Sequence, residues 1–195
     1  MRLFTGIDLP QETAEKLERL QRQLRPAARL RWSSVENLHI TTKFIGEWPD
    51  RRLEELKEAL RRLDPGRPFP IRLGGLGWFP NSNSPKIFWI GVHAPPALAE
   101  LAARTEAALI RIGVEAEQRE FKPHLTLARI GTRGRPAVDL EELRHRVGEL
   151  EETEFGEFQC QSFHLYVSEP VEGGSRYTRI ASYEIPDGRE KGGND

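Results

Sequence analysis

The sequence predicts an α+β fold of two similar halves, each an antiparallel sheet with flanking helices, related by a pseudo-twofold around a central cleft. Three observations support this bilobal fold. The chain repeats its own motifs, and the two copies carry strand and helix patterns in the same order. The composition, with 37% apolar and 30% charged residues, is ordinary for a globular protein.

The repeat is visible in two pairs of segments that share one offset. GIDLP at 6–10 matches GVHAP at 91–95, and HITTKFIG at 39–46 matches HLTLARIG at 124–131, so both pairs lie 85 residues apart. Chance similarity between amphipathic segments does not explain several matches in a single register. The sequence therefore predicts a duplicated unit.

The repeat predicts one bilobal domain over residues 1–185, with internal repeats at about 1–86 and 87–185. The final segment, 186–195, is charged and rich in glycine. Such a composition is typical of a disordered tail.

Both repeats predict the same order of elements. A strand leads to a helix that begins after a proline, a second strand carries a histidine motif, and another helix and strand follow. The predicted strands outside the histidine motifs cover about 2–8, 68–75, 87–93, 158–167 and 177–185, and the second helix of each repeat covers about 50–63 and 139–150.

Charge and apolar runs exclude several classes of function. A formal net charge of -1 argues against a general nucleic-acid coater, whose affinity comes from many released counterions. No apolar run approaches the roughly 18 residues of a membrane span. The opening MRLFTGIDLP predicts a first strand rather than a signal segment, and the single cysteine, Cys160, has no internal disulfide partner. We therefore expect a cytoplasmic monomer without a membrane partner.

The histidine motifs predict a polar face on each central strand. Successive side chains of a strand point to opposite faces, so His39 shares a face with Thr41, and His124 with Thr126. Only two of the five histidines have threonine two places on, and these two lie in the register of the repeat. Coincidence is a poor explanation for that pattern, and we interpret these four residues as functional.

Two basic residues near the motifs are candidate phosphate ligands. Strand parity places Lys43 on the same face as His39, while Phe44 falls on the opposite, core-facing side. Arg129 does not share the parity of His124. Arg129 must therefore reach the cleft through a β-bulge or from beyond the end of the strand.

Paired histidines suit a displacement at phosphorus. Near neutral pH one imidazole can take a proton from water while the other protonates the leaving oxygen. Threonine hydroxyls can donate hydrogen bonds to the non-bridging phosphate oxygens. The motifs contain no HxxxH or CxxC spacing for a metal, so we expect neither a metal nor another cofactor.

The motifs HITTKFIG and KPHLTLARIG resemble the paired HxT motifs of the 2H phosphoesterases, specifically the LigT-like RNA 2',3'-cyclic phosphodiesterases, also called 2'-5' RNA ligases. The similarity extends through LFTGIDLP, RWSSVENLH and LYVSEPVEGGSRYTRI, so it covers nearly the whole chain. The resemblance implies a bilobal fold and metal-independent hydrolysis of RNA 2',3'-cyclic phosphate ends to 2'-phosphomonoesters.

The resemblance also implies roles for individual residues, and it favours His39 as the acid and His124 as the base, an order that the residues alone leave open. Thr42 departs from the family pattern, which usually has an apolar residue there. The implied catalytic and phosphate-binding residues are His39, Thr41, His124, Thr126 and Arg129.

Alternative functions share parts of this pattern. A non-catalytic module could bind nucleotides or RNA ends, although phosphate binding alone needs no acid and base pair. The same chemistry could act on small cyclic-phosphate nucleotides instead of RNA ends, and the reverse reaction would ligate RNA 2'-5'. The remaining histidines, His93, His145 and His164, are interpreted as structural or surface residues.

Overall fold

The computed structural model describes residues 1–131, 139–151, 153–172 and 174–187. From residue 188 onward, the predicted tail lies outside the described residues. Within these ranges, no helix is long and apolar enough to cross a membrane.

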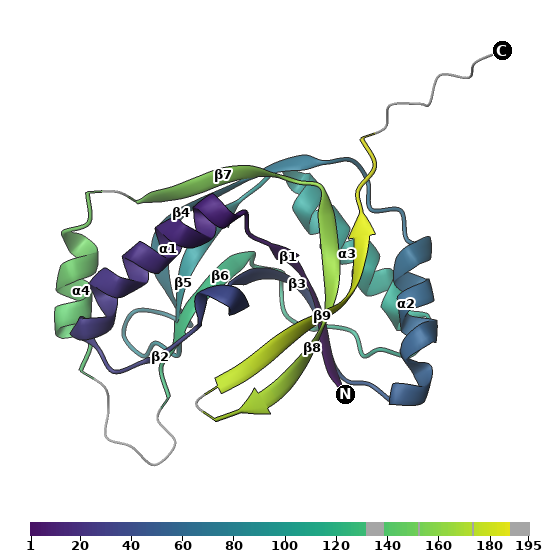
Figure 1. The fold of residues 1–195 in the computed structure, drawn as a ribbon, viewed down its shortest axis with the longest axis horizontal. Coiled ribbons are helices and arrows are strands. Elements are labelled where there is room, and N and C mark those ends of the chain that lie inside the picture. The colour runs from purple at the N-terminus through teal and green to yellow at the C-terminus, as the bar shows by residue number, and fades with distance from the viewer. Residues whose placement is uncertain (132–138, 152, 173, 188–195) are drawn as a thin grey trace.

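The α+β fold class is confirmed (Figure 1). The strands are β1 (Arg2–Asp8), β2 (Arg31–Trp32), β3 (His39–Glu47), β4 (Phe69–Phe79), β5 (Ile87–His93), β6 (His124–Arg129), β7 (Glu154–Cys160), β8 (Ser162–Val171) and β9 (Gly174–Glu184). The helices are α1 (Gln11–Leu24), α2 (Leu53–Arg62), α3 (Pro96–Ile110) and α4 (Glu141–Gly148).

The strands form a curled antiparallel sheet with the order β7-β4-β5-β6-β3-β1-β8-β9, and β2 pairs with β6. We call β7, β4, β5 and β6 the His124 half, and β3, β1, β8 and β9 the His39 half. The two expected sheets are joined by a single registered pair, Ile40 of β3 with Leu125 of β6, so they form one continuous sheet. We call this pair the β3–β6 junction.

Each half of the sheet contains elements from both sequence repeats. The strand β4 pairs with β5 and β7, while β8 pairs with β1. Helix α1 contacts β7 and α4, whereas α3 contacts β3 and α2. Figure 1 shows the α1–α4 and α2–α3 pairs at opposite ends of the sheet. The repeat boundary near residue 86 is therefore not the boundary between the halves.

The helices cover one face of the sheet and leave the histidine motifs on the other. Ile40 and Leu125 are completely buried in the apolar cluster that also contains Leu17 of α1 and Leu98 of α3. We call this side the helix face. His39 and Thr41 alternate with Ile40 along β3, so they point away from the helices to what we call the histidine face.

A β-bulge interrupts the alternation in β3. Thr41 lies opposite Gly6 of β1. The next residue of β1, Thr5, lies opposite Lys43, so Thr42 is an extra residue. Because side chains alternate with a period of two, the extra residue reverses the parity of the residues that follow it, Lys43 and Phe44. A second extra residue, Ile45, lies between the pairs Phe4–Phe44 and Leu3–Gly46.

The corresponding strand of the second repeat contains the same bulge. Thr126 of β6 lies opposite Trp89 of β5. The next pair is Phe88 with Ala128, which leaves Leu127 as the extra residue. Thr42 and Leu127 occupy equivalent positions in HITTKFIG and HLTLARIG, so the duplication has kept the bulge.

Two strand predictions need correction. The predicted strand at 158–167 combines the end of β7 with the start of β8, which separate near Gln161. The alternating sequence continues through this point without glycine or proline, so it contains no signal for the break. Strand β4 also continues past the predicted end at residue 75, as far as Phe79.

The polar residue at the bulge is explained by a buried hydrogen bond. The hydroxyl oxygens of Thr42 and Thr5 lie 2.7 Å apart, and both side chains are buried on the helix face. A threonine at this position is therefore compatible with the core, because its hydroxyl has a partner.

Replacing Thr42 with valine should lower the free energy of unfolding by about 1–3 kcal/mol, because the buried hydroxyl of Thr5 loses its partner. Replacing both threonines with valine should cost clearly less than the sum of the single changes, since no polar group is then left unsatisfied. Urea denaturation of the two single variants and the double variant measures this coupling. Purely additive losses would contradict the proposed pairing.

Candidate active site

The four HxT side chains meet on the histidine face where the two halves join. Continuing the antiparallel register of the β3–β6 junction by one residue each way places His39 across from Thr126 and Thr41 across from His124. The two histidines are therefore diagonal neighbours, for which a sheet gives Cα separations of ~7–8 Å. This spacing leaves room for a phosphate group between the imidazoles.

The same backbone contact orients each imidazole. Nδ1 of His39 lies 2.7 Å from the carbonyl oxygen of Asn37, and Nδ1 of His124 lies 2.7 Å from that of Lys122. Because a carbonyl oxygen only accepts hydrogen bonds, Nδ1 is the protonated nitrogen in both neutral rings. Nε2 is therefore the atom that gains or loses a proton in each imidazole.

The two imidazoles differ in their other contacts. The ring of His39 stacks on Phe4 with centroids 4.7 Å apart, and its Nε2 lies 2.9 Å from the hydroxyl of Thr41. The ring of His124 meets Phe79 edge-on at 4.9 Å. His39 is the more enclosed of the two imidazoles.

Burial is the largest influence on both imidazoles and lowers the pKa of each below the ordinary value of 6.5. For His39, the hydrogen bond to Asn37 and the carboxylate of Asp8 raise the pKa, while the charges of Arg129 and His124 lower it further. For His124, the hydrogen bond to its carbonyl partner raises the pKa and Arg129 lowers it. The positive charge of Arg129 therefore reaches both histidines.

Arg129 reaches the histidine face through the bulge at Leu127, which is one of the two routes that the sequence left open. Beyond the bulge, Arg129 pairs across the strands with Ile87, two positions further along β5 from the partner of Thr126. Arg31 of β2 pairs directly with Arg129, so a second guanidinium belongs to the same face. Arg31 could not be predicted from the sequence, because a two-residue strand is too short to show an alternating pattern.

The prediction that Lys43 shares a face with His39 is wrong. The bulge at Thr42 turns Lys43 toward the helix face, where it is only 6% exposed. Its Nζ lies 2.6 Å from the carboxylate of Glu106 in α3 and 2.9 Å from the carbonyl oxygen of Glu115. Lys43 therefore holds β3 to the segment around α3 and is not a phosphate ligand in this arrangement.

The same bulge brings Phe44 to the histidine face, although strict alternation assigned it to the core. Its side chain is 52% exposed and lies beside Phe4, with ring centroids 6.1 Å apart. The other exposed large apolar residues among those described, Ile110 and Val171, are aliphatic. Phe44 occupies the position in its repeat that Arg129 occupies in the other. An exposed aromatic ring next to the HxT groups is suited to stacking on a nucleobase.

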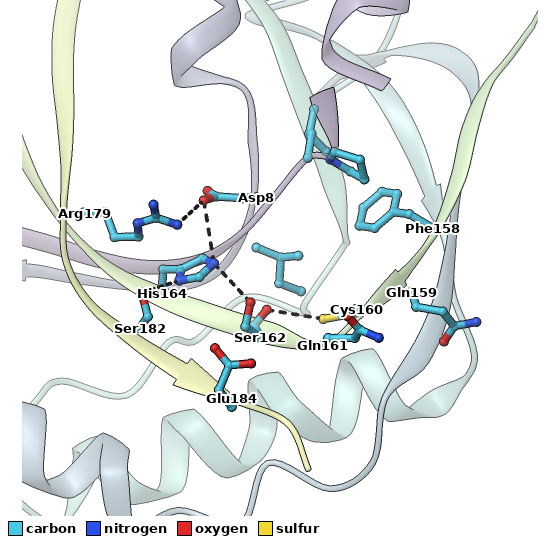
Figure 2. A pocket seen from close by; sticks show the side chains of 13 residues that line it. Asp8, Phe158, Gln159, Cys160, Gln161, Ser162, His164, Arg179, Ser182 and Glu184 are labelled. Carbon is cyan, nitrogen blue, oxygen red and sulfur yellow. Dashed lines mark hydrogen bonds and ion pairs between the residues drawn. The ribbon is translucent and has the colours of Figure 1, made fainter. Parts of the chain in front are cut away.

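A polar pocket of about 470 Å³, shown in Figure 2, is lined by Asp8, the cross-strand neighbour of His39, among other residues. Asp8 and Arg179 line it together with His164, a residue that the sequence suggested was structural or surface. His164 is 5% exposed, and its Nδ1 lies 3.0 Å from the hydroxyl of Ser182. Cys160 also borders the pocket, and burial raises the pKa of its thiol to about 12, which makes it a poor nucleophile.

The described residues contain no group of three or more His, Cys, Asp or Glu side chains placed to hold a metal ion. What the histidine face does contain is a pair of imidazoles with Nε2 available, two hydroxyls and the guanidinium groups of Arg129 and Arg31. This set can move protons and hold the charge of a phosphate ester, so the class that the fold and site define is a phosphoesterase.

Comparison with known proteins identifies the family. The pattern of the family described as LigT like phosphoesterase matches the chain twice, over residues 7–89 and 90–177. An RNA 2',3'-cyclic phosphodiesterase of Methanocaldococcus jannaschii is 33% identical over 183 residues, which is 94% of this chain and 100% of the relative. Another from Aeropyrum pernix is 36% identical over 152 residues, which is 77% of this chain and 82% of the relative. The chain belongs to the LigT like phosphoesterase family.

Solved structures share the whole fold. The crystal structure of TT0787 of Thermus thermophilus superposes with a TM-score of 0.76 at 26% identity, covering 97% of this chain and 100% of that one. The E. coli LigT complexed with 3'-AMP gives a TM-score of 0.73 at 25% identity, covering 94% and 97%. The family resemblance and the fold expected from the sequence are therefore confirmed.

Proposed function

We propose that this protein hydrolyses RNA 2',3'-cyclic phosphate ends to 2'-phosphomonoesters with its two histidines as acid and base. The observation that carries the proposal is the matched pair of imidazoles. Both have Nδ1 committed to a backbone carbonyl, and both belong to one face of the sheet, on neighbouring strands. The names of the relatives, which are RNA 2',3'-cyclic phosphodiesterases, support the substrate class.

The proposed reaction is an in-line displacement at phosphorus. Nε2 of His124 takes a proton from a water molecule, whose oxygen forms the new bond to phosphorus. The bond from phosphorus to the 3'-oxygen breaks, and Nε2 of His39 gives its proton to that oxygen. The hydroxyls of Thr41 and Thr126 and the guanidinium of Arg129 bind the non-bridging oxygens, where charge is concentrated during the reaction.

The order of the two roles is supported by the different enclosure of the imidazoles. A general base must reach a water molecule, and His124 is the more open of the two. A general acid must hold its proton next to the leaving oxygen, and His39 is fixed by Phe4, Thr41 and Asn37. The reverse reaction would join RNA ends 2'-5', and excess water favours hydrolysis over it.

The central test is incubation with a short RNA that ends in a 2',3'-cyclic phosphate, followed by identification of the product. The wild type should form the 2'-phosphomonoester, and His39→Ala or His124→Ala should lower kcat by about 10²- to 10⁴-fold. The double variant should lose clearly less than the product of the two single losses, because acid and base act in one step.

A modified substrate separates the two roles. When sulfur replaces the leaving 3'-oxygen, departure needs little protonation, because a thiol is much more acidic than an alcohol. This substrate should recover rate in His39→Ala but not in His124→Ala. Recovery in the opposite variant would reverse the assignment, and a fully active single variant would contradict the paired mechanism.

The pH dependence of kcat/KM should be bell-shaped with its maximum below pH 6.5. The rate should rise with pH as His124 loses its proton and fall as His39 loses its own, and burial lowers the pKa of both imidazoles below 6.5. The two apparent values belong to the coupled pair. A rate that climbs steadily through the neutral range would point to hydroxide attack without a histidine acid.

Replacing Phe44 with alanine should weaken the use of nucleoside substrates by about 1–3 kcal/mol, mainly through KM, because a nucleobase loses its stacking partner. Phe44→Trp should retain activity. Ribose 2',3'-cyclic phosphate, which has no base, should be hydrolysed equally by the wild type and the alanine variant. Ile110→Ala, which shortens an exposed apolar side chain on α3, is the matched control. A loss that is independent of the base would contradict stacking on Phe44.

A further inference from the structure

The two histidines face different residues on the neighbouring strand. Asp8 of β1 lies opposite His39, and Gly91 of β5 lies opposite His124. The sequence repeat instead matches Asp8 with His93. The pairing of β5 with β6 is therefore shifted by two residues relative to that of β1 with β3. A shift of two preserves the faces of the strand but changes which side chain meets the histidine.

The position opposite His124 has no room for a side chain. A Cβ atom added to Gly91 would lie 2.5 Å from the backbone carbonyl oxygen of Gly74 in β4. Backbone atoms of a paired strand cannot move away as a flexible side chain could. No carboxylate can therefore occupy the place beside His124 that Asp8 occupies beside His39.

The carboxylate of Asp8 is held in a fixed position. The hydroxyl of Tyr166 donates a hydrogen bond to Oδ1, and a guanidinium nitrogen of Arg179 lies 3.0 Å from Oδ2. Nε2 of His164 lies 3.6 Å from the same oxygen. Figure 2 shows Arg179 and His164 converging on Asp8 within the polar pocket. Tyr166 also stacks on Phe4, which in turn stacks on His39.

Charged and titratable groups approach His39 from several elements. Asp8 of β1 is the negative group that acts on it, while Arg129 and His124 of β6 oppose the protonated form. The rings of Tyr166 in β8 and Tyr177 in β9 lie 6.1 Å and 5.2 Å from its ring.

The groups around Asp8 itself come from β8 and β9. His164 is the other imidazole near Asp8, and burial lowers its pKa, which favours its neutral form. Arg179 lowers that pKa as well, whereas Asp8 and Glu184 raise it. With His164 neutral, Arg179 is the positively charged group that pairs with Asp8 in this pocket.

We propose that Asp8 is a positioning residue whose carboxylate favours the protonated form of His39, and thereby makes His39, rather than His124, the acid of the proposed reaction. The role rests on the proposed function but concerns a residue that neither HxT motif contains. The two histidines come from a duplicated motif and therefore start in equivalent surroundings. An acid and a base must nevertheless differ in protonation state, so the two surroundings must differ as well. Asp8 provides a difference in charge that the packing around Gly91 denies to the other half.

The test combines an NMR titration of the imidazoles with kinetics on cyclic-phosphate RNA. Asp8→Asn keeps the shape of the side chain and removes its charge, so the His39 midpoint should move to lower pH while that of His124 changes little. The falling limb of the kcat/KM profile should move in the same direction. At pH 7.5 the rate should fall by about two- to fivefold, a size expected because Asp8 is 42% exposed and screened by water.

Two further variants separate charge from structure. Asp8→Glu keeps the charge and should leave the His39 midpoint near its wild-type position. Glu184→Gln removes a carboxylate from the same pocket that acts on His164 rather than on His39, and it should not move the falling limb. An unchanged His39 midpoint in Asp8→Asn, or an equal shift of both histidines, would overturn the proposal. Because the titration needs no substrate, a wild type inactive on RNA would refute the proposed function separately.

Discussion

The pairing of Ile40 with Leu125 is the contact on which the rest of the structure depends. It joins β3 to β6 and makes one sheet from two halves, and its residues occupy the same position in the two sequence repeats. The pseudo-twofold must therefore pass close to this pair. One position away on the opposite face, the same pairing brings His39 beside Thr126. The same register therefore places the apolar junction on one face of the sheet and the polar site on the other. A shift of the pairing by one residue would exchange the side chains of the two faces.

Simple alternation along the strands predicted much of the site. It placed the four HxT side chains opposite Ile40 and Leu125, and the structure agrees as far as the bulges. Beyond them the same rule failed for Lys43 and Phe44, because a bulge has no reliable signature in a single sequence. Arg129 reaches the histidine face through the bulge at Leu127, which was one of the two routes predicted for it. The fold class was easier to predict than the site, because a bulge changes neither the order of the elements nor the overall period of the sequence pattern.

Other features depend on contacts between distant segments and could not be predicted from local patterns. The repeat was visible in the sequence, but its elements are exchanged between the halves, with α1 against β7 and α3 against β3. The two-residue shift that sets Asp8 opposite His39 is equally hidden, since Gly6 and Gly91 align perfectly in the sequence. Arg31 and Tyr166 join the site only through strand pairing. Each of these features arises from tertiary packing rather than from the composition of a segment.

The exchange of elements has a consequence for the history of the chain. A single repeat on its own would contain the central strand pair β1–β3, but the strand that extends this pair, β8, and the helix that contacts it, α3, belong to the other repeat. An ancestral unit of this length would have had exposed strand edges and an uncovered apolar face. Two identical copies could supply each other with the missing parts, as in a swapped homodimer with its reactive groups on the symmetry axis. Gene fusion would then have freed the two imidazoles to diverge, something that identical subunits could not do.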